Sequence, residues 1–452
     1  MPSPTCKAYC LLWICVFAVT YVVGGIAVTS ASGHAKGNTT RVVIVLKAEL
    51  IMLLMSVFIY KRIMALFEPQ GNVKPDEDNK LAIAAIEMRL APYRKIASIA
   101  TIVWLTLSHL MYFLYYFPDW AQHALFLLSA TSLGVWTYLI ALLFGFSLVN
   151  LATRVVQMSA LGTRLIKPLL DIPLIKNLTL NSRLQTQIAL FATLFFSLLT
   201  FYSCDKVTVK QLSLHLKDTP AQAKGMRLGL ISDLHVGGTV GAAEINMVVE
   251  LANEQQLDAI FIVGDLVDGT VSSLSSMVSP IQHLKAKHGV FFVTGNHEYY
   301  YGDANDWTQL LPKYGVKVLQ NANHDLNGVC LVGLDDISAE KSGTANHAMD
   351  ASKAIKGCTP DRPIIALAHN PVSAFNISKI TEPRPVDLIL SGHTHAGQFY
   401  VVAPVVYMLL PFLHGMYNLP NGGRMLVSAG TLYQGPPMKM AGYSELWVIT
   451  LQ

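Results

Sequence analysis

The chain has 452 residues, of which 52% are hydrophobic and 14% are charged, and its formal net charge is +4. This composition is too apolar for an average soluble protein, and so small a charge excess predicts no nucleic-acid partner. The six cysteines form no CxxC pair, which argues against a zinc knuckle or a disulfide scaffold. Apolar residues concentrate before residue 205, so we expect a membrane half followed by a globular half.

The first half contains five stretches that approach the length of about 20 apolar residues needed to cross a bilayer. These predicted spans cover residues 8–28, 42–60, 97–117, 124–151 and 187–204. The first stretch follows Lys7, so a cleaved signal peptide is the alternative, but its apolar run is long for one and we favour an anchor. Pro168 and Pro173 interrupt the apolar segment 161–175, which favours an interfacial or packed loop over a sixth span.

Two of these spans carry charged or titratable residues. Lys47 and Glu49 lie in the second span, and His109 lies in the third. Lys47 and Glu49 are two positions apart and therefore do not share a helix face. We favour the interpretation that Lys47 reaches a nearby membrane interface, and the alternative is a polar site within the membrane.

Lys and Arg residues in the short loops predict the orientation of the spans. They are frequent in residues 61–95 and 154–183, whereas the opposite loops contain only Lys36 and Arg41. We therefore expect the basic loops to be cytosolic. The chain after Cys204 is then lumenal or extracellular.

Sequons and cysteines bear on the same orientation. Asn38 and Asn376 begin glycosylation sequons on the predicted outer side, and Asn177 begins one in a predicted cytosolic loop. An outer location would permit a disulfide between Cys330 and Cys358. Because Cys330 lies in an apolar run, we favour a buried thiol there.

After residues 205–225, which we interpret as a linker, short apolar runs alternate with helical patterns. The runs predict strands at residues 227–232, 259–263, 290–294, 329–334, 364–368, 388–390, 425–427 and 446–451. Residues 245–252 and 307–314 have apolar side chains at helical spacing. The alternation predicts an α/β domain over residues 226–452.

Side chains that can bind metal follow five of the predicted strands. In chain order they are Asp233, His235, Asp265, Asn296, His297, His369, His393 and His395. Ligands of open α/β sheets bind beyond the carboxyl ends of the strands, so we expect these residues to meet at one edge. Each residue alone would be a helix cap, a turn residue or an ordinary histidine, which is how we interpret His324, His347 and His414.

This set of side chains suits phosphoryl chemistry. Two divalent ions about 3.5–4 Å apart can clamp a phosphoryl group and activate a water molecule. A carboxylate can give one oxygen to each ion, and Asp265 is the natural candidate for that bridge. Imidazole, carboxylate and amide ligands without thiolate suit Mn, Fe, Zn or Mg.

The blocks ISDLHVG, IVGDLVDG, VTGNHEYY, ALAHNP and LILSGHTHAGQ occur in this order. Together they resemble the motifs of the calcineurin-like metallophosphoesterase superfamily, and their residues are most similar to those of its bacterial membrane-associated branch. The resemblance covers most of residues 226–452 and implies a β-sandwich flanked by helices. Ala396 stands where this branch usually has glycine, a small change with which we still expect activity.

The resemblance implies a role for each motif residue. The first metal site would consist of Asp233, His235, Asp265 and His395. The second metal site would share Asp265 and add Asn296, His369 and His393. His297 would lie off the metals, near the phosphate, as an electrostatic stabiliser or general acid, and Asp268 could orient His297.

We therefore expect a multi-pass membrane protein that hydrolyses a phosphate mono- or diester with two divalent cations. The alternatives are a metal-binding scaffold without turnover and a transporter with an appended domain. Every ligand is retained, which argues against the scaffold, and few charges and no repeat occur in the spans, which argues against the transporter.

We expect the residues that determine substrate specificity to lie in 299–305, 338–361 and 400–421. The last segment is apolar and could pack on the core or dip toward the bilayer, and the substrate could be lipid-linked.

Overall fold

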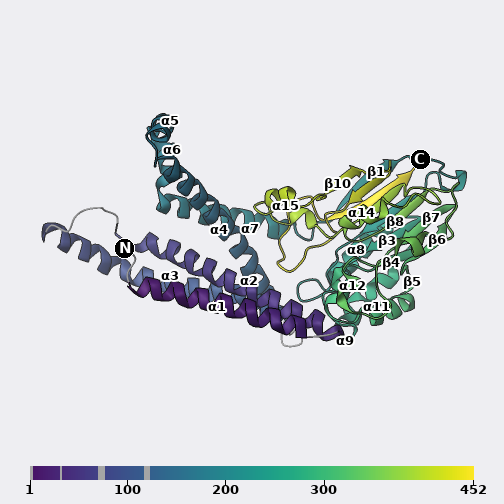
Figure 1. The fold of residues 1–452 in the computed structure, drawn as a ribbon, viewed down its shortest axis with the longest axis horizontal. Helices are drawn as coiled ribbons and strands as arrows, with labels where there is room; N and C mark the ends of the chain where they lie inside the picture. The colour runs from purple at the N-terminus through teal and green to yellow at the C-terminus, as the bar shows by residue number, and fades with distance from the viewer. Residues whose placement is uncertain (1–3, 31–32, 70–76, 117–122) are drawn as a thin grey trace. The chain divides into compact units, whose positions relative to one another are not determined.

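The computed structural model describes residues 4–30, 33–69, 77–116 and 123–452 (Figure 1). The chain divides into two compact units. One unit consists of residues 48–113 and 128–198, and the other consists of residues 1–47, 114–127 and 199–452. The described strands all belong to the second unit, in the teal to yellow part of the ribbon in Figure 1.

The first half of the chain is helical. Its long helices are α1 (Pro4–Ser30), α2 (Gly33–Met64), α3 (Glu77–Tyr116), α4 (His123–Val156) and α7 (Ser182–Ser203). Among the described residues, four segments are long and apolar enough to cross a membrane: Val42–Phe67, Ala84–Leu114, Ala124–Val156 and Ser182–Ser203. The predicted span at residues 8–28 is not confirmed, because the described apolar part of α1, Phe17–Ser30, is shorter.

Two short helices connect α4 to α7. These are α5 (Ala160–Leu170) and α6 (Pro173–Leu180), and Pro173 opens α6, where a missing N–H removes no helical hydrogen bond. Neither helix approaches the length of a membrane span. The segment agrees with the prediction that no sixth span lies here.

The titratable side chains of Lys47, Glu49 and His109 on the apolar helices have polar or aromatic partners. In one unit, Glu49 on α2 forms an ion pair with Nδ1 of His109 on α3. Nε2 of His109 lies 3.1 Å from Oγ of Ser56. In the other unit, Nζ of Lys47 lies 3.8 Å from the ring centre of Tyr21. Glu49 therefore belongs to a polar cluster between apolar helices, which is the alternative that sequence analysis did not favour.

The second half of the chain folds into two six-stranded sheets with the orders β1-β12-β2-β3-β4-β5 and β10-β11-β9-β8-β7-β6. The strands are β1 (Thr208–Leu214), β2 (Arg227–Ile231), β3 (Ala259–Val263), β4 (Val290–Val293), β5 (Val316–Val318), β6 (Ala322–Leu326), β7 (Val329–Gly333), β8 (Ile364–Leu367), β9 (Leu388–Ser391), β10 (Gly415–Asn418), β11 (Arg424–Val427) and β12 (Glu445–Leu451). Strands β2 to β5 are parallel, and so are β7, β8, β9 and β11.

The two sheets share an apolar core. Phe261 and Phe291 of the first sheet and Ile365 and Leu390 of the second are fully buried in it. A second cluster joins the first sheet to α8 (Ala242–Glu254), α9 (Val271–Val278) and α11 (Ala304–Leu310). A third cluster joins the second sheet to α13 (Ala351–Ile355) and α14 (Ala374–Ile377). This is the mixed α/β fold that the sequence predicts.

Strand β1 lies inside residues 205–225, which sequence analysis interpreted as a linker. It pairs in parallel with β12, with Thr208 opposite Glu445. The sheet therefore begins almost directly after α7. The sequence TVKQLSL mixes polar and apolar residues because β1 is a half-exposed edge strand, which weakens its signal.

The pairing of two cysteines also differs from expectation. Cys330 on β7 and Cys358 form a disulfide, with Cα atoms 5.8 Å apart, on the outer face of the second sheet. Sequence analysis favoured a thiol at Cys330 because the strand around it is apolar. Both residues are buried, so the apolar surroundings hold a disulfide and not a thiol.

Candidate metal centre

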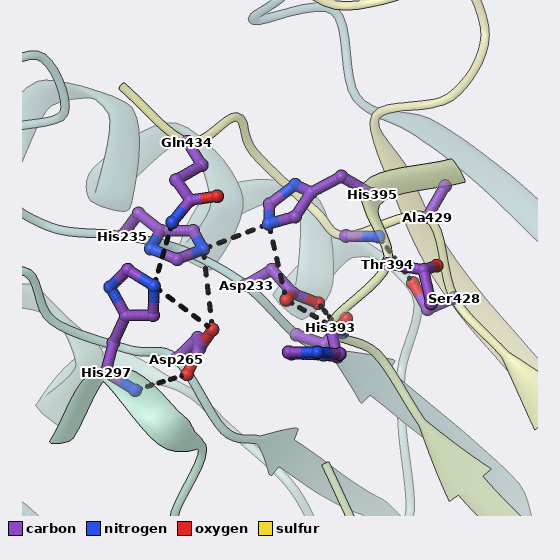
Figure 2. Close-up of polar contacts among 12 residues, drawn as sticks. Asp233, His235, Asp265, His297, His393, Thr394, His395, Ser428, Ala429 and Gln434 are labelled. Carbon is purple, nitrogen blue, oxygen red and sulfur yellow. Dashed lines mark hydrogen bonds and ion pairs between the residues drawn. The ribbon is translucent and has the colours of Figure 1, made fainter. Parts of the chain in front are cut away.

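The residues predicted as metal ligands lie at the carboxyl ends of strands from both sheets. They follow β2 (Asp233 and His235), β3 (Asp265), β4 (Asn296), β8 (His369) and β9 (His393 and His395). All are buried except His393, which is partly exposed. Figure 2 shows the side chains of Asp233, His235, Asp265 and His395 pointing toward one another.

The loops that carry these side chains have an unusual backbone. The φ angle is 55° at Asp233, 49° at His235, 50° at Asp265, 74° at His393 and 48° at His395. Side chains disfavour this left-handed region, at a cost on the order of 1–3 kcal/mol for each residue, and such strain concentrates at functional sites. The surrounding fold therefore holds these ligands in conformations that an unconstrained loop would leave.

Asp233, His235 and His395 form one group whose ligand atoms all lie within 4.8 Å of one another. Nδ1 of His235 lies 2.9 Å from Oδ1 of Asp268 and donates to it, which leaves Nε2 as an acceptor. That Nε2 lies 3.0 Å from Nε2 of His395. Burial and the neighbouring His235 lower the pKa of His395 well below its usual value, so His395 is the neutral imidazole that a metal requires.

Asp265, His369 and His393 form a second group within the same limit. Nδ1 of His369 donates to the carbonyl oxygen of Val263 at 2.8 Å, so Nε2 faces Oδ2 of Asp265 at 3.1 Å. Nδ1 of His393 and Oδ1 of Asn296 are buried and make no hydrogen bond within the described part of the chain. Buried acceptors without a partner cost about 1–3 kcal/mol each, and a bound cation would satisfy them.

Asp265 lies between the two groups. Its Oδ2 is 3.8 Å from Nε2 of His235 in the first group and 3.1 Å from Nε2 of His369 in the second. Burial raises the pKa of Asp265, but the facing His369 and His297 outweigh it and hold the pKa well below its usual value. An ionised carboxylate between two ligand groups is what a bridging ligand requires.

His297 lies against the first group. Its Nδ1 is 2.6 Å from Oδ1 of Asp268, and its Nε2 is 3.9 Å from Oδ2 of Asp265. Burial lowers the pKa of His297, but Asp265 and Asp268 outweigh this and raise the pKa to about 9. Asp268 contacts both His297 and His235, so it orients a predicted ligand as well as His297. Ligand atoms of His235, Asp265 and His297 also lie within 4.8 Å of one another. Distance alone therefore does not distinguish His297 from the predicted metal ligands.

Three polar residues of the site were not identified from the sequence. The carboxylate of Glu298 accepts from the backbone N–H of Gly295 at 2.6 Å and of Leu266 at 2.8 Å, which ties two ligand loops together. Its position three residues after the helix-capping Gly295 is a capping-box signal that could have revealed it. Nε2 of Gln434 lies 2.8 Å from Nε2 of His297.

The third is Lys439, which is fully buried. Its Nζ donates to the carbonyl oxygens of Gly430, at 2.8 Å, and Leu432. Burial lowers the pKa of Lys439 to about 7. Lys439 and Gln434 come from the loop after β11, which carries no recognisable motif.

Comparison with known proteins shows which family this sequence matches. Residues 226–397 match the family described as calcineurin-like phosphoesterase. The protein "transmembrane protein with metallophosphoesterase domain" from Danio rerio is 33% identical over 364 residues, which are 78% of this chain and 80% of that protein. The protein of that name from Bos taurus is 38% identical over 257 residues, which are 54% of this chain and 57% of that protein. Among solved structures, a dimetal phosphatase from Danio rerio has 11% identity and a TM-score of 0.30, covering 47% of this chain and 90% of that one.

Proposed function

Because the chain belongs to the calcineurin-like phosphoesterase family, we propose that it is a membrane-anchored, two-metal hydrolase of phosphate mono- or diesters. The observation that carries this proposal is the position of Asp265. Its buried carboxylate lies within 4 Å of imidazoles from two separate ligand groups. A carboxylate in this position can be shared by two cations.

The donor set fits two divalent cations. One would be held by Asp233, His235 and His395, the other by Asn296, His369 and His393, and Asp265 would be shared. When bound, such ions supply Lewis acidity toward phosphoryl oxygens and lower the pKa of water. Nitrogen and oxygen donors without thiolate suit Mn, Fe, Zn or Mg.

Within this site we assign His297 to the substrate. Asp268 accepts from Nδ1 of His297 and fixes the ring, so Nε2 is the atom that reaches the phosphoryl group. Asp265 and Asp268 raise the pKa of His297 to about 9, and the contact with Asp268 favours the protonated ring. His297 can then donate its Nε2 proton to the ester oxygen as water adds to phosphorus. The products are the alcohol and phosphate from a monoester, or the alcohol and a phosphomonoester from a diester.

The experiment is a screen of the full chain, purified in detergent, against p-nitrophenyl phosphate and bis(p-nitrophenyl) phosphate. Protein stripped with a chelator should be inactive, and Mn, Zn, Fe or Mg should restore turnover. Asp265→Asn should abolish turnover and lower metal content, whereas Asp306→Asn, at an exposed position on α11, should match the wild type. Turnover without metal, or an active Asp265→Asn protein, would sink the two-metal proposal, and inactivity on every ester would favour the scaffold.

We also propose that the catalytic half is lumenal or extracellular. The basic loops support this orientation, and so does the disulfide between Cys330 and Cys358, since disulfides persist in oxidising compartments. Part of the loop argument, including Lys74 and residues 118–122, lies outside the described residues. Asn38, in the predicted outer loop, has a side chain outside them too.

Orientation can be measured by protease protection of a C-terminal tag in sealed microsomes. The tag should be protected when protease is added from the cytosolic face. Asn376, exposed on α14, should carry glycan, and Asn177, exposed on α6, should carry none. Digestion of the tag from the cytosolic face, or glycan on Asn177, would overturn the orientation.

A further inference from the structure

An exposed apolar surface lies in the catalytic half. No Asp, Glu, Lys or Arg occurs between His395 and Arg424, and helix α15 (Ala403–Leu409) lies in this stretch. Its large side chains face outward, and Tyr407, Met408 and Leu409 are 71%, 75% and 75% exposed. With Val405 and Leu410 they form what we call the α15 patch. A contiguous apolar surface of this kind marks a site of interaction with protein or membrane.

The α15 patch is next to the candidate metal centre. The predicted ligand His395 begins a short turn, His395–Gly397, against which α15 packs. A side chain at Gly397 would lie only 2.7 Å from Cα of Ala403, so the turn and the start of α15 are in close contact. Whatever covers the patch therefore lies beside the metal ligands.

The end of a membrane helix is fixed to the same part of the domain. The backbone N–H of Lys439 donates to the carbonyl oxygen of Thr200, in the last turn of α7, at 3.1 Å. Oγ of Ser203 donates to the carbonyl oxygen of Lys439 at 2.7 Å, and Oγ of Ser444 donates to that of Cys204 at 2.7 Å. These bonds join the end of the candidate span directly to the catalytic domain, without a flexible linker.

The segment that begins at Lys439 and binds the end of α7 also contacts the residues just before α15. The backbone N–H of Met440 donates to the carbonyl oxygen of Gln398 at 3.0 Å, and the N–H of Ala441 donates to Oη of Tyr400 at 3.1 Å. Met440 also packs in an apolar cluster with Ala403. One short segment thus separates the end of α7 from α15.

This connection identifies the occupant of the patch. The last turn of α7 exposes Phe201 and Tyr202, and aromatic side chains are typical of the level where a span meets the headgroups. A helix with an apolar, uncharged face held close to that level lies against lipid. Headgroup phosphates are then the phosphate esters nearest to His395 and its neighbours.

We propose that the α15 patch rests on the bilayer surface and presents the metal centre to phosphate esters carried by membrane lipids. The substrate part of this inference rests on the proposed phosphoesterase function. In the reaction, the oxygen of water bonds to phosphorus and the bond from phosphorus to the ester oxygen breaks. The lipid leaves as an alcohol that takes up the proton, and phosphate or a phosphomonoester is released.

The position of the patch can be tested without any activity. The full chain is reconstituted in phosphatidylcholine vesicles that contain a diazirine-acyl phosphatidylcholine, irradiated, and mapped by mass spectrometry. Adducts should appear on residues 403–410 and on α7, the positive control, and not around Met277, an exposed apolar residue of α9. Labelling of α7 without α15 would overturn the assignment of the α15 patch to the bilayer surface.

The substrate class is tested with a variant and a matched control. Met408→Asp combined with Leu409→Asp removes the apolar face at exposed positions, and the control Met277→Asp is a single change of the same kind on α9. The α15 variant should lose about tenfold or more in phosphate release from vesicles with phosphatidic acid or phosphatidylinositol phosphates, since two apolar side chains no longer bind lipid. Its rate on p-nitrophenyl phosphate and its metal content should stay at the wild-type level.

The outcomes separate this inference from the proposed function. Equal loss on lipid and soluble esters, or no loss on either, would overturn the lipid-substrate assignment. So would a wild-type protein that hydrolyses p-nitrophenyl phosphate and releases nothing from any of these vesicles. If the wild type hydrolyses neither kind of ester, the proposed function fails, and the lipid adducts still decide whether the patch meets the bilayer.

Discussion

Replacing Gly295 with alanine perturbs the candidate metal centre through one added methyl group. Gly295 connects β4 to Asn296, and its backbone approaches Asp265 closely. A Cβ at Gly295 would overlap Oδ1 and the backbone nitrogen of Asp265 and would lie 2.9 Å from its Cγ. Since unstrained carbon contacts are about 3.5–4.0 Å long, the two loops must separate by roughly 1 Å.

The size of the effect follows from that displacement. Moving a catalytic group by about 1 Å can cost on the order of 10²-fold in rate. Overpacking of a tight site costs about 1–3 kcal/mol in the free energy of unfolding. We therefore expect the Gly295→Ala protein to fold with a lowered melting temperature, to bind metal poorly and to turn over p-nitrophenyl phosphate roughly a hundredfold more slowly.

Gly241 offers a matched control in the same domain. It is the N-cap residue of α8 as Gly295 is the N-cap residue of α10 (Asn296–Tyr300), and each glycine donates its N–H to the glutamate three residues later, Glu244 or Glu298. A Cβ at Gly241 would meet only the Glu244 carboxylate, at an ordinary 3.6 Å. Gly241→Ala should therefore keep wild-type metal content and turnover. A Gly295→Ala protein with wild-type activity and metal content would refute the position we give to Asp265.

Two further substitutions test other parts of the site. His297→Ala should keep both metals and lose on the order of 10²–10⁴ in rate, with a smaller loss for esters of p-nitrophenol, whose weakly basic phenolate leaves without a proton. Loss of metal in this variant would make His297 a ligand. Ala396→Gly should raise the free energy of unfolding by up to about 1 kcal/mol, because Ala396 has a φ of 51° that glycine adopts without strain; a denaturation midpoint below that of the wild type would contradict a strained loop.

The strands that carry the predicted ligands could be recognised from the sequence because they are buried on both faces. Strands β3 and β4 lie between the shared core and the covering helices, so every residue is apolar and the run stands out. The polar residue that interrupts each run then marks the strand end, as Asp265 does after β3. Edge strands such as β1 and β10 are half exposed and have no such contrast.

The parts that sequence analysis missed depend on where distant segments return. Gln434 and Lys439 reach the site from a loop after β11, and only the folded chain shows that Nζ of Lys439 supports the backbone at Gly430. The apolar segment 400–421 was ambiguous because apolar side chains suit a core and a membrane surface alike. The exposure of α15 shows that the first part does not pack in the core, whereas Leu413 and Leu419 pack inside.

The sharing of Asp265 between two cations can be measured directly by electron paramagnetic resonance. Full-length protein is stripped of metal, titrated with Mn²⁺, and examined beside Asp265→Asn. A carboxylate bridge holds two ions about 3.5–4 Å apart, so the wild type should bind two Mn²⁺ per chain and give an exchange-coupled spectrum, which Asp265→Asn should lose. A single Mn²⁺ per chain, or two that give the spectrum of isolated ions, would contradict the two-metal centre.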